Sequence, residues 1–115
     1  MDDDRAVADS LVLVLKMYGY EASCVYSGED AIATVEKNPC DILISDVVVE
    51  QGMSGIQLAI EFSKLLPTCK VFLMSGDNST LELLKDAHEG GHNFDVLAKP
   101  VHPGVILERL KALAA

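Results

Sequence analysis

The stretch that decides the fold is Cys40-Asp41-Ile42-Leu43-Ile44-Ser45-Asp46, an apolar strand pattern that ends on a carboxylate. Two further apolar segments end on polar side chains: residues 70–74 run into Ser75, and residues 94–98 run into Lys99. In an open parallel α/β sheet, ligands bind at the carboxyl edge of the strands. We therefore expect Asp46, Ser75 and Lys99 to lie at one such edge, where the acidic cluster Asp2-Asp3-Asp4 would complete a site for a divalent metal and a phosphoryl group.

Helical and strand patterns alternate along the rest of the chain, which favours βα units and a parallel sheet. The expected strands are residues 21–26, 41–45, 70–74 and 94–98. The expected helices are residues 5–18, 28–37, the segment between the Gly-rich loop 50–55 and Pro67, the segment 79–90, and a last one that starts at Pro103. Ser27 and Ser79 each begin a pattern that resembles a capping box.

Length and composition limit the possible classes of protein. The 115 residues fit a single domain, 1–115, and the half that is hydrophobic can form a core without disulfides. A net charge of -9 argues against a nucleic-acid-binding surface. The N-terminus is acidic and no apolar run is long enough for a signal or membrane segment, so we expect a soluble, cytoplasmic protein. The cysteines Cys24, Cys40 and Cys69 form no C-x-x-C pair and are expected to be small buried hydrophobes.

Taken in order, the motifs resemble the receiver domain of bacterial two-component response regulators over the whole chain. The resemblance rests on Asp2-Asp3, Gly19-Tyr20, Asp46, Met53-Ser54-Gly55, Ser75-Gly76 and Lys99-Pro100. It implies a flavodoxin-like, doubly wound parallel sheet in the strand order 2-1-3-4-5, with helices on both faces in three α/β/α layers. It also implies a signalling module rather than an enzyme.

The resemblance assigns a role to each candidate site residue. Asp46 would accept a phosphoryl group from a phosphohistidine on a sensor histidine kinase or a histidine phosphotransfer protein. Mg²⁺ would be bound by Asp3 directly, by Asp2 through water, by Asp46 and by the Val48 carbonyl. Ser75 would donate a hydrogen bond to a phosphoryl oxygen, and Lys99 would pair with it. The signal would pass by a conformational change to a downstream protein, through the face formed by helix 79–90, strand 94–98 and the last helix.

General chemistry agrees with these roles. Crowded carboxylates repel one another unless a cation intervenes, and Mg²⁺ prefers such oxygen ligands. A carboxylate can act as a nucleophile that forms an acyl phosphate. A fixed positive charge, here Lys99, stabilises the transferring phosphoryl group.

The sequence departs from the family pattern at several places, among them the loop after Asp46, which is one residue longer than usual and has Glu50-Gln51 where a proline is common. Only Met1 precedes Asp2, so the first, central strand is missing, and the acidic pair would lie on a frayed terminus. We expect the gap to be filled by a strand from a partner chain, by a displaced segment (20–26 or 11–15), or by residues outside this sequence. Val96 stands where an aromatic switch residue is common. Val48 is apolar and cannot orient an attacking water, so we hypothesise a slowly hydrolysed phosphoaspartate.

Several alternatives stay open at this point. Asp46 alone could be a capping residue, and the acidic cluster could be a solvated terminus. The three histidines, His88, His92 and His102, lack metal-ligand spacing and are expected on the surface or in loops. The main alternative function is a truncated, phosphorylation-incompetent interaction module with a receiver-like fold, which forms a homodimer through its open sheet. A small hydrolase is a more distant alternative.

Overall fold

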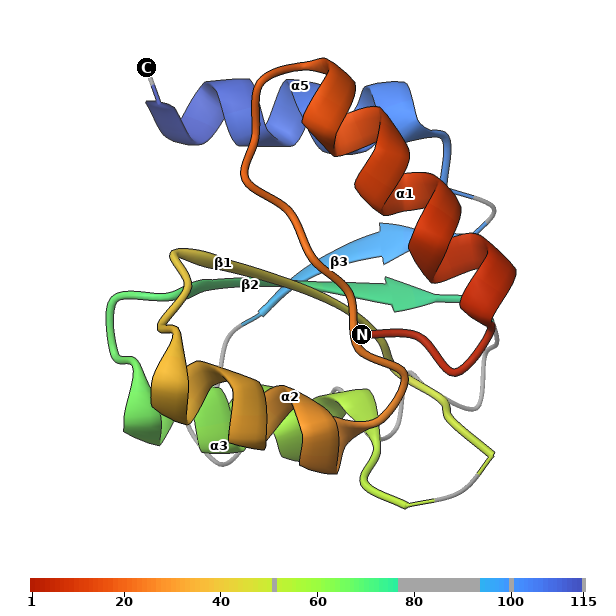
Figure 1. Cartoon of the computed structure of the whole chain (residues 1–115). Coiled ribbons are helices and arrows are strands. Elements are labelled where there is room, and N and C mark those ends of the chain that lie inside the picture. Colours follow the sequence, from red (N-terminus) through yellow and green to blue (C-terminus); the bar gives the residue numbers. More distant parts are fainter. Residues whose placement is uncertain (51, 77–93, 100, 115) are drawn as a thin grey trace.

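The structure is a computed structural model that describes residues 1–50, 52–76, 94–99 and 101–114. In this part of the chain, helices cover both faces of a parallel sheet (Figure 1). The strands are β1 (Ile42–Asp46), β2 (Lys70–Ser75) and β3 (Asp95–Ala98), in the order β1-β2-β3. The helices are α1 (Arg5–Met17), α2 (Gly28–Lys37), α3 (Gly55–Leu65) and α5 (Pro103–Ala114). The expected flavodoxin-like α/β architecture is confirmed.

Local sequence signals explain where the helices begin. The Asp4 side chain accepts hydrogen bonds from the backbone at the start of α1, and Ser27 does the same for α2. Ser54 and Gln57 form a full capping box at the start of α3, because each side chain bonds the other residue's backbone N–H. Gly19, with a φ of +90°, lies in the left-handed region just after α1, where a side chain would be strained.

The hydrophobic core consists of two clusters, one on each side of the sheet. On the side of α2 and α3 the buried residues include Leu58, Phe62, Val71 and Leu73. On the side of α1 and α5 they are Leu15, Phe72, Leu97, Ile106 and Leu110. Successive side chains of a strand point to opposite faces, so the two clusters alternate along β2. The continuous apolar run of β2 is therefore typical of a parallel strand buried on both sides.

The strand expected at residues 21–26 is not formed: residues 21–25 have no regular secondary structure. Met1 and Asp2 lie between this segment and β1. Asp2 N donates to Val25 O (3.3 Å), Met1 N donates to Ile44 O, and Asp46 N donates to Met1 O (2.9 Å). A strand forms when a neighbouring segment pairs with it along its length. In the described structure Met1 and Asp2 pair only with the end of β1 and with Val25, so residues 21–26 have too short a neighbour to form a strand. The sheet is therefore three-stranded in the described residues.

Neither of the two displaced segments considered as candidates for the gap beside β1 fills it. Residues 11–15 are part of α1 and do not fill the gap, and residues 20–26 do not pair with β1 as a strand. The acidic pair does not lie on a frayed terminus either, because Met1 is hydrogen-bonded to β1 and Asp2 is 3 % exposed.

A cavity of about 740 Å³ remains beside β1, lined by residues of α1, residues 19–25, α2 and β1. Other expectations fall on positions that the structure does not describe: the helix 79–90, Pro100, His88 and His92. His102 is exposed, as expected for a surface histidine, and its Nδ1 accepts a hydrogen bond from Gly104 N. No helix in the described ranges has both the length and the apolar composition of a membrane span.

Candidate functional site

The parallel sheet brings three predicted site residues to its carboxyl edge. Asp46 is the last residue of β1, Ser75 is the last residue of β2, and Lys99 follows β3 directly. Lys99 Nζ lies 2.9 Å from Asp46 Oδ2, and Lys99 N donates to Ser75 O at 2.8 Å. Because the ends of neighbouring parallel strands lie side by side, residues far apart in the sequence meet here.

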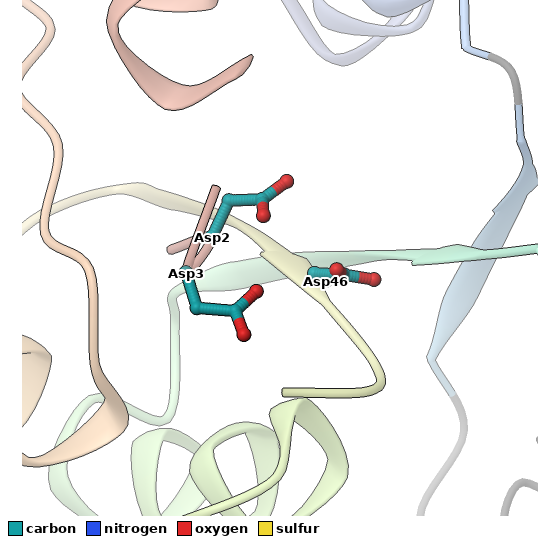
Figure 2. Close-up of side chains that lie close together, drawn as sticks. All are labelled: Asp2, Asp3 and Asp46. Atoms are coloured by element: carbon teal, nitrogen blue, oxygen red, sulfur yellow. The ribbon is translucent and has the colours of Figure 1, made fainter. Parts of the chain in front are cut away.

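Three carboxylates converge at this edge. One carboxylate oxygen from each of Asp2, Asp3 and Asp46 lies within 4.8 Å of the other two. Figure 2 shows the three side chains together. Asp2 and Asp46 are buried, the latter with 7 % of its surface exposed, whereas Asp3 is exposed. Asp3 Oδ2 accepts a hydrogen bond from Glu50 N at 3.0 Å, which connects the N-terminal segment to the loop after β1.

Asp2 carries the least satisfied carboxylate of the cluster. Its Oδ1 accepts from Asp4 N at 3.0 Å, but its Oδ2 is buried and has no hydrogen-bond partner among the described residues. Burial raises the pKa of Asp2, and the negative charge of Asp46 raises it further, although the hydrogen bond from Asp4 N and the charge of Lys99 act in the opposite direction. The site therefore holds more negative charge than its own side chains neutralise.

The backbone fixes the direction of Asp46. Asp46 N donates to Met1 O, and Val47 N continues the ladder by donating to Met74 O at 3.0 Å. At the start of α3, Gly55 N donates to Val47 O at 2.9 Å. A Cβ on Gly55 would lie 1.9 Å from the Asp46 carbonyl oxygen, so only glycine allows α3 to approach the site this closely.

A divalent cation such as Mg²⁺ fits this group of residues. The atoms of this cluster that could bind a metal are carboxylate oxygens, the ligands that Mg²⁺ prefers. A cation would satisfy the buried Oδ2 of Asp2 and offset the repulsion among the three carboxylates. Val48, expected to offer its carbonyl, lies in the loop just after β1, and its apolar side chain is 51 % exposed.

Some features of the site and its surroundings were not visible in the sequence. The contact of Glu50 N with Asp3 and the close approach of Gly55 to Asp46 both depend on how the loop after β1 folds. The cysteines, expected to be buried hydrophobes, are half-buried, and Cys40 and Cys69 pack against the core cluster on the side of α2 and α3. Cys40 and Cys69 lie together at the opposite edge of the sheet.

Comparisons with known proteins agree with this geometry. A sequence model of the family described as "Response regulator receiver domain" matches residues 1–111. A protein of Chloroflexus aurantiacus J-10-fl, described as a candidate response regulator, is 36 % identical, with a TM-score of 0.79; the alignment covers 98 % of this chain and 92 % of that one. A CheY-like receiver domain protein of Methanospirillum hungatei JF-1 is 28 % identical, with a TM-score of 0.86 and coverages of 97 % and 87 %.

A third similar structure carries the name of an enzyme. It is described as adenylate cyclase from Rhodopirellula baltica and is 25 % identical, with a TM-score of 0.84; the alignment covers 96 % of this chain and 81 % of that one. That name describes the other protein.

Proposed function

Because the chain belongs to the response regulator receiver domain family, we propose that Asp46 accepts a phosphoryl group in a Mg²⁺-dependent step. Receiver domains are generally signalling modules that interact with histidine kinases or phosphotransfer proteins and with effector domains. The observation that carries the proposal is the arrangement at the carboxyl edge: a buried Asp46 beside two further carboxylates, with the Lys99 ammonium 2.9 Å from its Oδ2.

The transfer uses Asp46 as a carboxylate nucleophile. One Asp46 oxygen bonds to phosphorus while the bond from phosphorus to the donor imidazole nitrogen breaks, so the imidazole leaves with the electron pair and the product is an acyl phosphate. Negative charge spreads over the phosphoryl oxygens during this step, and catalysis consists mainly of positioning and charge stabilisation. Lys99 would supply one fixed positive charge, and Ser75, at the end of the adjacent strand, would donate a hydrogen bond to a phosphoryl oxygen.

The metal-binding residues in this proposal are Asp2, Asp3, Asp46 and the Val48 carbonyl. Receiver domains bind Mg²⁺ through acidic residues. When bound, the cation neutralises charge on the transferring group. The protein's own contribution is to hold the carboxylates together. Asp46 N donates to the carbonyl oxygen of Met1, the residue before Asp2, and Asp3 Oδ2 accepts from Glu50 N.

The module would act through protein contacts and have no enzymatic activity of its own. The phosphoryl donor would be a sensor histidine kinase or a histidine phosphotransfer protein, and the output a downstream protein. The described part of the expected output face is β3 and α5, where Val96 is 39 % exposed and Val105 is also exposed. A cytoplasmic location is consistent with such partners.

The test is intact mass after incubation with acetyl phosphate and Mg²⁺. The parent chain is expected to gain one phosphoryl group, and Asp46→Asn none. Asp41→Asn is the matched control, because Asp41 is an exposed carboxylate just before the same strand. The proposal is wrong if the folded parent gains no phosphoryl group, or if Asp46→Asn gains it as readily as the parent.

The cavity beside β1 favours a second candidate function, an interaction module that dimerises through the open sheet. In and beside β1, the backbone N–H and C=O groups of alternate residues, 41, 43, 45 and 47, point toward β2. The backbone groups of Ile42 and Ile44 therefore point the other way, toward the cavity. An extended segment of a second copy could continue there the pairing that Met1 begins. Sedimentation equilibrium separates the two candidates: a dimer that forms equally in the parent and in Asp46→Asn supports the second, and a monomer excludes it.

A further inference from the structure

The start of the sheet, opposite the acidic edge, holds a pair of thiols that the proposed function does not use. Cys40 lies two residues before β1 and Cys69 lies directly before β2. The two strands are parallel neighbours with Ile42 opposite Lys70, and Lys70 N donates to Asp41 O at 2.9 Å. This register places the two cysteines diagonally across the same strand pair.

The two sulfur atoms are close together, and their residues are only partly buried. Cys40 Sγ and Cys69 Sγ are 3.9 Å apart, in hydrogen-bonding contact, and both side chains are half-buried. A disulfide bond is about 2.05 Å long, so the two sulfur atoms need to approach by about 2 Å to form one. Both side chains also pack against the core cluster on the side of α2 and α3, which restricts how far they can move apart.

We propose that Cys40 and Cys69 are a redox-active dithiol that hydrogen peroxide oxidises to a disulfide across the start of β1 and β2. The Cys40 thiolate attacks one peroxide oxygen, the O–O bond breaks, and hydroxide leaves, which converts Cys40 to a sulfenic acid. The Cys69 sulfur then attacks the Cys40 sulfur, the S–O bond breaks, and water leaves with the Cys69 proton. In total two thiols are oxidised and one peroxide is reduced to two waters.

The local electrostatics agree with this order of events. Its contact with Cys69 lowers the pKa of Cys40 to about 7, against the opposing effects of burial and of Asp41. The same contact, together with burial, raises the pKa of Cys69. The thiolate is the reactive form of a cysteine, so Cys40 is the thiol that attacks first and Cys69 is the one that resolves.

The third cysteine provides a matched control. Cys24 is half-buried like the other two, but its Sγ contacts oxygen atoms, Asp9 Oδ1 at 3.2 Å and Tyr26 Oη at 3.7 Å. It has a similar exposure without a thiol neighbour. Cys24→Ser is therefore expected to leave the disulfide reaction unchanged.

The experiment treats the full, reduced chain with hydrogen peroxide and measures intact mass and non-reducing peptide maps. The parent and Cys24→Ser are expected to lose two hydrogens and to yield one peptide pair that links positions 40 and 69, which dithiothreitol reverses. Cys69→Ser is expected to form no disulfide and to give a dimedone adduct at Cys40. Far-UV circular dichroism checks that each variant is folded.

Three results would overturn the proposal: folded parent chain that gains oxygen without forming a disulfide, a disulfide that involves Cys24, or a link between two chains. The parent chain and its peptide map decide the matter even if a serine variant does not fold. None of these outcomes depends on phosphorylation of Asp46.

Discussion

Replacing Asp2 with asparagine should stabilise the metal-free chain and at the same time weaken Mg²⁺ binding. Two like charges at 4.8 Å, the limit of the carboxylate cluster, repel by about 3.5 kcal/mol at an effective dielectric constant of about 20. Lys99, 2.9 Å from Asp46, offsets part of this repulsion. The Asp2 Oδ2 atom is also buried without a partner among the described residues, a situation that costs about 1–3 kcal/mol.

Asparagine keeps the Oδ1 acceptor for Asp4 N, removes the buried charge, and replaces the unpartnered oxygen with an N–H donor close to the carboxylates of Asp3 and Asp46. We therefore expect Asp2→Asn to raise the free energy of unfolding in EDTA by about 1–3 kcal/mol, or the Tm by about 4 °C per kcal/mol for a chain of this size. In Mg²⁺ the parent is stabilised by binding to the folded state, and the variant much less. The advantage of the variant should shrink or reverse as Mg²⁺ is added.

The pH dependence gives a second measure of the same effect. Burial raises the pKa of Asp2 in the folded chain above its unfolded value. The stability linked to the protonated form is present below the unfolded pKa and is lost as the pH rises through the folded pKa. In EDTA the stability of the parent should fall in this window relative to that of Asp2→Asn.

The assay is urea denaturation in EDTA and in Mg²⁺, with Asp41→Asn as the control for removing an exposed carboxylate. If Asp2→Asn is less stable than the parent in EDTA, the buried charge of Asp2 does not destabilise the metal-free chain, and this prediction is refuted. It is also refuted if Mg²⁺ stabilises the two chains equally.

Three further substitutions test other parts of the site. Lys99→Met should slow phosphorylation by acetyl phosphate about 10- to 100-fold, because it removes a charge-assisted contact worth about 1.5–3 kcal/mol; an unchanged rate would exclude Lys99 from the transfer. Gly55→Ala should cost at least about 1–3 kcal/mol in urea denaturation, because its Cβ meets the Asp46 carbonyl oxygen; a neutral effect would contradict the close packing of α3. Val48→Asn should speed loss of the phosphoryl group, measured by intact mass over time, because an amide beside Asp46 can orient water; equal rates would remove Val48 as the cause of slow hydrolysis.

Much of the fold follows from local patterns in the sequence. The apolar runs that become β1, β2 and β3 are bounded by turn and polar residues, and Ser27 marks the start of a helix. The meeting of Asp46 with Lys99 follows from the strand positions, because parallel topology places strand ends together. These features can be predicted from the residue pattern within each segment together with the parallel topology of alternating strands and helices.

The features that the sequence did not predict depend on contacts between segments far apart in the chain. Residues 21–26 have a strand pattern, but a strand forms only with a neighbour along its length, and Met1 and Asp2 provide just the last step. Asp2 is buried because Met1 bonds to β1, which no local pattern indicates. The contact of Cys40 with Cys69 depends on the exact register of β1 against β2, which the continuous apolar pattern of each strand does not fix.

We expect Asp46, within the acidic edge of the sheet, to be the residue that carries the phosphoryl group. Borohydride reduction of the chain after treatment with acetyl phosphate and Mg²⁺ tests this directly, because hydride converts an acyl phosphate to an alcohol that tandem mass spectrometry can locate. We predict reduction to homoserine at position 46 alone, and at no position when EDTA replaces Mg²⁺. Homoserine at another aspartate, or none in a chain shown to be folded, would contradict the claim.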